Sequence, residues 1–372
     1  MIIGVPKEIK LQEHRIGLTP DSVKILHEKG HKVIIETNGG FEAGFTDQDY
    51  QNAGAIIYKD AKTIFNDSEI IVKVKEPQSE EVDMIREDQI IYTYLHLAAA
   101  KKLTEGLIKS KSICIAYETV TDSNGRLPLL APMSAVAGRM SVQAGAHSLE
   151  KNQKGRGLLI GGAPGVEPAT VVILGGGVVG ENAAVIATGM KGKVYIVDKS
   201  KQRLEELHKK FGDKIIPSES GNTDLKKLVS ECDLLIGGVL IPGASAPKLV
   251  TKEMIKNMKR GSVVVDVAID QGGCVETSKP TTHANPTYLV DEVVHYCVAN
   301  MPGGVPRTST MALNKATLPL LIKLADQGYK KTLKENKNYL AGLNIYKGKV
   351  TFKGVADALN LSYTPPDSAL LD

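Results

Sequence analysis

A glycine-rich turn between an apolar segment and a helical segment constrains this chain more than any other feature. Thr170-Val-Val-Ile-Leu174 is rich in β-branched residues and predicts a buried strand, which leads directly into Gly175-Gly-Gly177-Val-Val-Gly180. In such a G-x-G-x-x-G pattern the first glycine makes a tight turn, the second lets the backbone approach a pyrophosphate, and the third lets helix and strand pack closely. The diphosphate would bind the unpaired N–H groups at the positive end of the following helix.

A second predicted strand, residues 193–198, ends in Asp198, about 20 residues after Gly175. Dinucleotide-binding folds use an acid at this place to bind the adenosine ribose hydroxyls. The motif therefore has its strand, its helix and its acid, which favours nucleotide binding over a merely glycine-rich turn. Lys199, Lys201 and Arg203 follow at once and suggest the alternative of NADP, but Asp198 at the strand terminus favours NAD.

Composition and charge exclude several other classes of protein. The 372 residues suffice for about two domains. The net charge of +4 is scattered and Trp is absent, which argues against a nucleic-acid partner. Neither a signal peptide nor a membrane span is expected, and the four distant cysteines are typical of reduced thiols in a cytoplasmic protein. The histidines show no metal-binding spacing, so we expect no metal site.

The order of strand and helix patterns predicts an α/β fold with two Rossmann-like domains and mostly parallel sheets. Short strands alternate with helices in the first 130 residues, before the glycine-rich turn begins. The segment after Pro306 is too short for a core of its own. We therefore expect residues 1–130 and 307–372 to form one discontinuous substrate domain, into which a dinucleotide-binding domain of residues 131–306 is inserted.

Several polar residues stand where a predicted strand ends or a loop begins, and open α/β sheets gather their sites at such places. They are Arg15, Lys75, His96, Asp270 and Asn300. Taken singly, each is more often structural or solvated. The sequence has neither a G-x-S-x-G nor a Walker motif, which leaves hydride transfer as the candidate chemistry. His96 and Asp270 would then handle protons, and Arg15 and Lys75 would hold the carboxylate of a substrate.

These residues lie in motifs that resemble those of bacterial alanine dehydrogenase, and the resemblance covers essentially the whole chain. The matching segments are Ile3-Gly-Val-Pro-Lys-Glu-Ile-Lys, Glu13-His-Arg-Ile-Gly-Leu-Thr-Pro20, Lys73-Val-Lys-Glu-Pro77, Tyr94-Leu-His96, Met133-Ser134, Gly175–Gly180, Leu240-Ile-Pro-Gly243, Asp266-Val-Ala-Ile-Asp-Gln-Gly-Gly273 and Val298-Ala-Asn-Met-Pro302. The chain departs from the family pattern at Leu11-Gln12, Gly17 and Glu181. None of these departures removes a group assigned to the chemistry.

The resemblance implies reversible oxidative deamination of L-alanine by NAD to pyruvate, ammonium and NADH. By this matching Arg15 and Lys75 would hold the carboxylate, and Met133 and Asn300 would also bind the substrate. His96 would act as general acid and base. Asp270 would handle the amine and the water that attacks the imine.

The same matching implies the residues of the dinucleotide site and the state of assembly. Besides Gly175, Gly177 and Gly180, the cofactor-binding residues would be Ser134, Val178, Val179, Asp198, Arg203, Ser220, Val239, Leu240, Val267, Asp270, Lys279, Val298 and Met301. The protein would be a cytoplasmic homohexamer.

Two alternatives differ in class from an amino-acid dehydrogenase. The nucleotide-binding subunit of a transhydrogenase would share the fold and the neighbourhoods of Arg15 and Lys75, but that family lacks counterparts of His96 and Asp270. A non-catalytic NAD-binding protein would have no reason to keep two cations, a histidine and an aspartate at loop ends.

Overall fold

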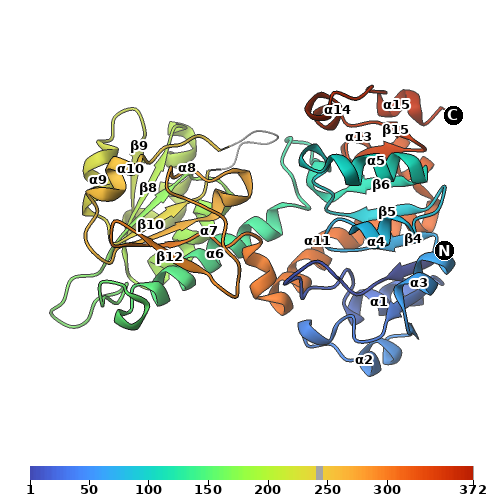
Figure 1. Cartoon of the computed structure of the whole chain (residues 1–372), viewed down its shortest axis with the longest axis horizontal. Coiled ribbons are helices and arrows are strands. Elements are labelled where there is room, and N and C mark those ends of the chain that lie inside the picture. Colours follow the sequence, from blue (N-terminus) through green and yellow to red (C-terminus); the bar gives the residue numbers. More distant parts are fainter. Residues whose placement is uncertain (240–245, 372) are drawn as a thin grey trace. The chain divides into compact units, whose positions relative to one another are not determined.

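The chain folds into two compact units, and the first is built from two separate stretches of sequence (Figure 1). The computed structural model describes residues 1–239 and 246–371. Met1–Met133 and Gly303–Asp372 form the first unit, and Ser134–Pro302 forms the second. The boundaries between the units therefore lie a few residues from the expected positions 130 and 306. Both units contain a mostly parallel sheet with helices, so the predicted α/β class is confirmed.

Within the described residues, unit 1 has an eight-stranded sheet of order β15-β14-β6-β5-β4-β1-β2-β3. Its strands are β1 (Ile2–Val5), β2 (Lys32–Glu36), β3 (Ile56–Tyr58), β4 (Ile70–Val72), β5 (Ile90–Thr93), β6 (Ile113–Ala116), β14 (Leu343–Tyr346) and β15 (Lys349–Val350). The six strands from the N-terminal segment are parallel. The C-terminal segment extends the sheet, because β14 pairs antiparallel with β6.

The helices of unit 1 follow the start signals in the sequence. Thr19 caps α1, its side chain accepting from Ser22 N, and Pro20 occupies the first turn as predicted. The helices are α1 (Pro20–Glu28), α2 (Asp47–Asn52), α3 (Ala61–Asp67), α4 (Ser79–Val82), α5 (Lys101–Ser110), α11 (Pro306–Gln327), α12 (Tyr329–Glu335), α13 (Lys337–Leu340), α14 (Lys353–Leu359) and α15 (Pro366–Ala369). Helix α6 (Ala131–Ser148) begins at the end of unit 1 and continues in unit 2.

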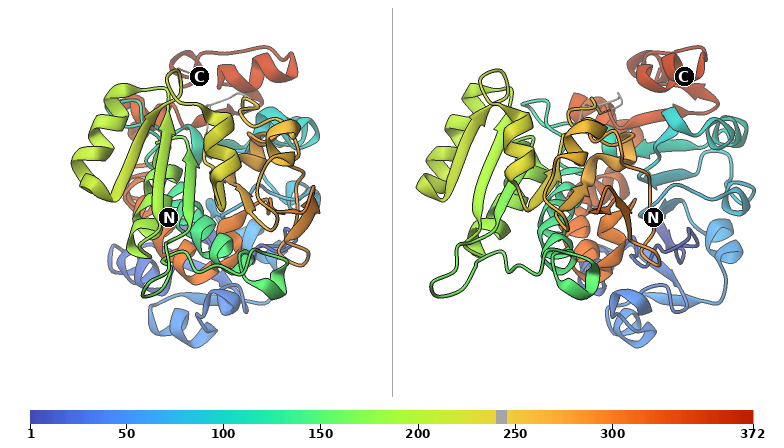
Figure 2. Two further views of the ribbon diagram at one scale, coloured as in Figure 1. Left: turned by 90° about the vertical axis from the view of Figure 1, so that its left-hand side faces the viewer. Right: turned by 60° about the vertical axis from the view of Figure 1, so that its left-hand side comes forward.

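The described part of unit 2 has a seven-stranded sheet of order β12-β13-β11-β10-β7-β8-β9, parallel except for β12. Figure 2 shows the yellow-green strands of this sheet side by side. The strands are β7 (Thr170–Leu174), β8 (Lys193–Asp198), β9 (Ile215–Glu219), β10 (Leu234–Gly237), β11 (Val263–Asp266), β12 (Thr287–Val290) and β13 (Val293–Tyr296). Its helices after α6 are α7 (Val178–Gly189), α8 (Lys201–Phe211), α9 (Leu225–Glu231) and α10 (Lys252–Lys256).

Residues of β7 alternate between two separate apolar cores, one on each face of the unit 2 sheet. Val171 and Ile173 pack in a core with residues of α6, α7 and α8, while Val172 and Leu174 pack with residues of α9 and α10. Successive strand residues point to opposite faces, so a continuous apolar strand requires cover on both. This packing explains why the segment before the glycine-rich turn has no polar face.

The four cysteines are buried as thiols, in agreement with the sequence prediction. Burial raises the pKa of Cys114 and of Cys232 to about 12, so these thiols stay protonated. Along residues 1–239 and 246–371, no helix is both long and apolar enough to cross a membrane.

Candidate functional site

Three of the predicted site residues of unit 1 follow neighbouring parallel strands. Arg15 lies in the loop after β1, Lys75 follows β4, and His96 follows β5. Because β1 pairs with β4 and β4 with β5, all in parallel, the three loops leave the same edge of the sheet. We call Arg15, Lys75 and His96 the basic cluster.

Arg15 is buried, with 2% of its surface exposed, and its guanidinium is paired within unit 1. Nε and Nη2 donate to the two carboxylate oxygens of Glu13 at 2.6 and 2.5 Å. Nη1 donates to Sδ of Met133 at 3.0 Å, so the structure brings these two predicted substrate-binding residues together. Burial lowers the pKa of Arg15, but the hydrogen bonds and charge of Glu13 raise it more, and the side chain is a fixed cation.

The backbone of Lys75 is held by two neighbours. Its N–H donates to Glu8 Oε1 at 3.3 Å, and its carbonyl accepts from Thr93 Oγ1 at 3.0 Å. Glu8 also binds the fully buried Lys73, whose Nζ donates to Glu8 Oε2 at 3.0 Å and to Glu81 Oε1 at 2.7 Å. A buried ion triad therefore fixes the chain immediately before Lys75.

His96 has a left-handed backbone with φ of 50°, a conformation that few non-glycine residues adopt. A carboxylate of Glu118 supports it by accepting from the His96 N–H at 2.6 Å and from the Leu95 N–H at 3.1 Å. The imidazole lies beside the Tyr94 ring, with 5.9 Å between the ring centres, and about half of its side chain is exposed. The turn thus presents an accessible imidazole on a firmly held backbone.

Glu76 is the carboxylate that faces this imidazole. Its Oε2 lies 3.7 Å from His96 Nδ1, a separation that suits an ion pair better than a hydrogen bond, and its Oε1 pairs with Lys10. Burial raises the pKa of Glu76, but His96 and Lys10 lower it to about 2. Glu76 is consequently ionised at neutral pH and lies next to the predicted proton carrier.

In unit 2 the three glycines of the turn have the geometry that their spacing predicts. Gly175 has φ of +95°, which only glycine adopts readily. A Cβ at Gly180 would lie 1.8 Å from the Gly175 carbonyl oxygen, so helix α7 packs directly on the turn. A Cβ at Gly177 would meet no atom of residues 1–239 and 246–371 within 4 Å. Gly177 is also the N-cap of α7, and its lack of a side chain leaves the first N–H groups of the helix without a side-chain cap, which suits a diphosphate.

Asp198 and Arg203 meet this turn at its middle glycine. Asp198 Oδ2 accepts from Gly176 N at 2.6 Å and Oδ1 accepts from Ser200 N at 2.8 Å. Arg203 Nε donates to the Gly176 carbonyl at 2.7 Å. Ser220 N donates to the Asp198 carbonyl at 3.0 Å, so Ser220 joins the same strand ends. The structure therefore gathers an acid, a cation and the glycine-rich turn in one place.

The apolar residues expected around the nucleotide differ in exposure. Val178 is 43% exposed at the start of α7, and Val179 is buried behind it. Val239 is partly buried beside Gly175. Leu240 falls outside the described residues. Ser134 is partly buried in α6.

The remaining predicted residues lie in the later loops of unit 2. Val267 and Asp270 belong to the 3-10 helix η6 (Val267–Gln271), and Asp270 is exposed. The buried Asp266 holds this loop by accepting from Ala268 N at 3.2 Å and from Ser278 Oγ at 2.6 Å. Asp270 is thus presented on a supported turn.

Lys279, Val298, Asn300 and Met301 have distinct surroundings. Lys279 is exposed, with Nζ 5.2 Å from the centre of the Tyr288 ring. Val298 and Met301 are buried in the core of the sheet. Asn300 has a left-handed φ of 60°, and its carbonyl accepts from His283 Nε2 at 3.1 Å.

Sequence reasoning missed the carboxylates that hold the basic cluster. Glu13 and Glu76 are close in sequence to Arg15 and Lys75, and an acid beside a predicted catalytic cation is the signal that could have found them. Glu118 carries no such signal, because its contact with His96 depends on the pairing of β5 with β6.

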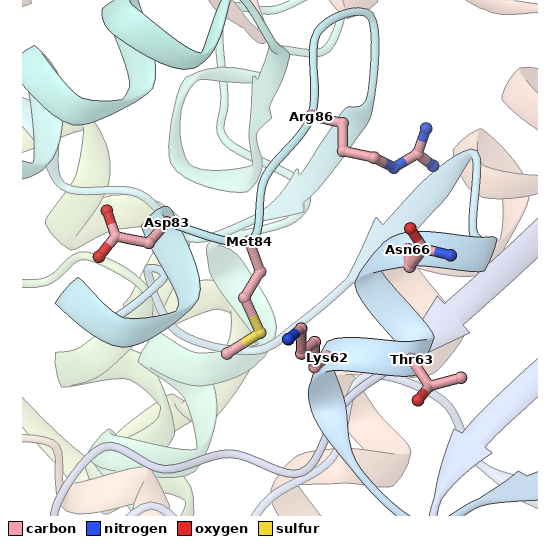
Figure 3. Close-up of a pocket in the computed structure, with 6 residues that line it drawn as sticks. All are labelled: Lys62, Thr63, Asn66, Asp83, Met84 and Arg86. Carbon is pink, nitrogen blue, oxygen red and sulfur yellow. The ribbon is translucent and has the colours of Figure 1, made fainter.

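A surface pocket of about 380 Å³ elsewhere in unit 1 contains none of the predicted site residues (Figure 3). It is lined by Lys62, Thr63, Asn66, Asp83, Met84 and Arg86. The guanidinium of Arg86 donates to the carbonyls of Phe65 at 3.2 Å and Ser68 at 2.7 Å, so it holds the C-terminal end of α3.

Comparison with known proteins relates both units to one family. Residues 4–137 match the N-terminal domain of alanine dehydrogenase/PNT, and residues 141–353 match the C-terminal domain. The alanine dehydrogenase of Halomonas elongata is 55% identical over 370 residues, which cover 100% of each chain.

Solved structures agree with this match. A structure titled L-alanine dehydrogenase has a TM-score of 0.94 and 52% identity, over 97% of this chain and 99% of that one. A transhydrogenase from Sinorhizobium meliloti has a TM-score of 0.82 at 24% identity, covering 94% and 100% of the two chains, and shares the fold. The full-length identity and the two matched domains leave one conclusion: this chain belongs to the alanine dehydrogenase/PNT family.

Proposed function

We propose that this chain catalyses the reversible, NAD-dependent oxidative deamination of L-alanine to pyruvate, ammonium and NADH. The observation that carries the proposal is the basic cluster, held by carboxylates after the ends of β1, β4 and β5. It stands in a chain 55% identical to an alanine dehydrogenase over its full length. The glycine-rich turn of unit 2 supports the cofactor, because its geometry suits a dinucleotide.

The residues of unit 2 fit NAD. The N–H groups at the start of α7, which Gly177 caps with no side chain, would bind the diphosphate, and Asp198 would accept from the ribose hydroxyls. When bound, NAD supplies a hydride acceptor. Asp270, on its supported turn, would bind the amino group and later orient the water that replaces it.

Arg15 would bind the substrate carboxylate from a preset position. Glu13 already binds Nε and Nη2, which fixes the plane of the guanidinium. Nη1 donates to the thioether of Met133, and sulfur is a weak acceptor that a carboxylate oxygen would replace with gain in energy. Lys75 would provide the second cation, on a backbone held by Glu8 and Thr93.

His96 would carry the proton to and from the reacting oxygen. Its imidazole is accessible, and Nδ1 lies 3.7 Å from Oε2 of the ionised Glu76, which would orient the ring. Glu118 would keep the imidazole in position by holding the backbone of the turn. Accordingly, Glu76 and Glu118 are positioning residues, while His96 is a catalytic residue.

The transhydrogenase alternative explains less of the chain. The likeness to the transhydrogenase structure is at 24% identity and supports a common fold only. Dinucleotide binding alone would give no use to an exposed imidazole held next to Glu76.

We further propose that the chain is cytoplasmic and forms a homohexamer. Light scattering would test the hexamer by measuring the mass of the particles in solution.

The proposed function is tested by mixing the purified chain with L-alanine and NAD and following NADH by absorbance. We expect NADH to form with L-alanine and to require NAD rather than NADP. D-Alanine and L-lactate are the matched control substrates, since each keeps the carboxylate and the methyl group. Equal rates with L-lactate would contradict an amino-acid dehydrogenase.

A further inference from the structure

One carboxylate of unit 2 binds two cations of the neighbouring helix. Glu181 lies in the first turn of α7, where Oε2 pairs with Arg203 Nη2 and Oε1 pairs with Lys210 Nζ. Both cations belong to α8, the helix that follows Asp198. The side chain of Glu181 is 23% exposed and that of Arg203 is 30% exposed, so water only partly screens the pair.

The guanidinium of Arg203 is directed to protein partners on all three of its nitrogens. Nε donates to the Gly176 carbonyl at 2.7 Å and Nη1 to Glu206 Oε2 at 3.0 Å, while Nη2 pairs with Glu181. Burial raises the pKa of Glu181, but Lys210 and Arg203 lower it by more than burial raises it. Glu181 is therefore the charged partner of both cations.

The position of Arg203 matters because it lies beside the acid that would face the ribose. Gly176 donates its N–H to Asp198 and accepts from Arg203 through its carbonyl. A Cβ at Gly176 would lie 3.3 Å from Asp198 Oδ2 and 3.4 Å from Arg203 Cγ. A dinucleotide with a phosphate on the ribose 2′-oxygen would need a cation at this place.

We propose that Glu181 is a specificity-determining residue that keeps Arg203 from binding a 2′-phosphate. Asp198 repels the phosphate, and Glu181 withholds the cation of Arg203, which would otherwise offset that repulsion. Cofactor choice in this chain therefore depends on two acids, one on the strand end and one on α7. This inference rests on the proposed NAD-dependent function and adds a residue to it.

The test is nucleotide binding by the full-length Glu181→Gln variant, measured by fluorescence titration with NADH and NADPH. Glutamine keeps the shape of the side chain and removes its charge. We expect the dissociation constant for NADPH to fall roughly three- to tenfold, the value of one partly exposed charge-assisted contact. Binding of NADH should stay as in the wild type, because its ribose carries no phosphate.

Glu205→Gln is the matched control, since it removes the same charge from an exposed position of α8. It should leave NADPH binding as in the wild type. Glu206→Gln releases only Nη1 of Arg203 and should give a smaller gain. Glu181→Ala serves as a second variant, and the melting temperature of each variant shows whether it is folded.

The inference is overturned if folded Glu181→Gln and Glu181→Ala bind NADPH no better than the Glu205→Gln control does. That result would leave the proposed function intact, provided that NADH still binds. A wild-type chain that binds neither nucleotide would instead contradict the proposed function itself.

Discussion

The glycine-rich turn of unit 2 and the basic cluster of unit 1 are built by different means. The turn depends on backbone geometry: Gly175 adopts a positive φ and Gly180 lets α7 touch the turn. The basic cluster depends on charge, with Glu13 on Arg15, Glu76 on His96 and Glu8 holding the chain at Lys75. A backbone site is destroyed by added atoms, whereas a charge-braced site is destroyed by lost carboxylates.

Replacement of His96 by alanine should separate the two regions most strongly. We expect turnover to fall by about 10²–10⁴-fold, the usual contribution of a positioned acid or base, while NADH binding stays intact because unit 2 is unchanged. Steady-state kinetics and a fluorescence titration measure the two effects. His208→Ala, which removes an exposed imidazole from α8, is the control. Activity near that of the wild type would assign His96 a structural role.

Replacement of Glu76 by glutamine should show how much the carboxylate braces contribute to stability. The pKa of Glu76 falls from 4.5 to about 2 on folding, so its ionised form stabilises the fold above pH 4.5 and this contribution is lost as the pH falls towards 2. The shift corresponds to at most about 3 kcal/mol.

Denaturant unfolding of the wild type and Glu76→Gln measures this difference. The variant should be less stable at neutral pH, and the gap should close near pH 2. Glu80→Gln, on the exposed side of α4, should behave as the wild type at both pH values. A gap that persists unchanged in acid would show that ionisation of Glu76 is not its source.

Gly180→Ala and Gly177→Ala should affect different properties, stability and NADH binding, although the two glycines belong to one motif. At Gly180 the new methyl group would overlap the Gly175 carbonyl oxygen, and we expect a loss of roughly 1–3 kcal/mol in unfolding free energy. At Gly177 the methyl group meets no atom of the described residues within 4 Å, so stability should be kept while NADH binding weakens. Thermal melting with and without NADH measures both. If Gly177→Ala binds NADH normally, the diphosphate does not lie on this glycine.

Arg15→Lys should have the smallest effect of the five replacements. It keeps a positive charge but loses the planar fork that Glu13 orients. We expect the KM for pyruvate to rise roughly tenfold, equivalent to one charge-assisted hydrogen bond, with a smaller change in kcat. Steady-state kinetics at saturating NADH gives both constants. An unchanged KM for pyruvate would remove Arg15 from substrate binding.

The nucleotide region could be predicted from sequence because its determinants are local. The predicted strands at 170–174 and 193–198 are confirmed residue by residue, and Gly175 and Gly180 have the geometry that their spacing requires. Each of these features is encoded by residues that are close neighbours in the sequence.

The braces of the basic cluster could not be predicted in the same way. Glu118 reaches the His96 turn only because β5 and β6 pair in parallel, and Glu8 reaches Lys75 only because β1 and β4 do. The left-handed backbone of His96 likewise could not be predicted, because position 96 is neither a glycine nor an asparagine. Strand ends indicated where the cations lie, whereas long-range pairing decides which carboxylates hold them.

The most direct test of the central claim is the reverse reaction, because it distinguishes an amino-acid dehydrogenase from a hydroxy-acid dehydrogenase on the same substrate. The wild-type chain is mixed with NADH and pyruvate, and NADH consumption is followed with and without ammonium. We predict that NADH is consumed only when ammonium is present and that L-alanine accumulates. Equal consumption without ammonium, with lactate as the product, would contradict the account.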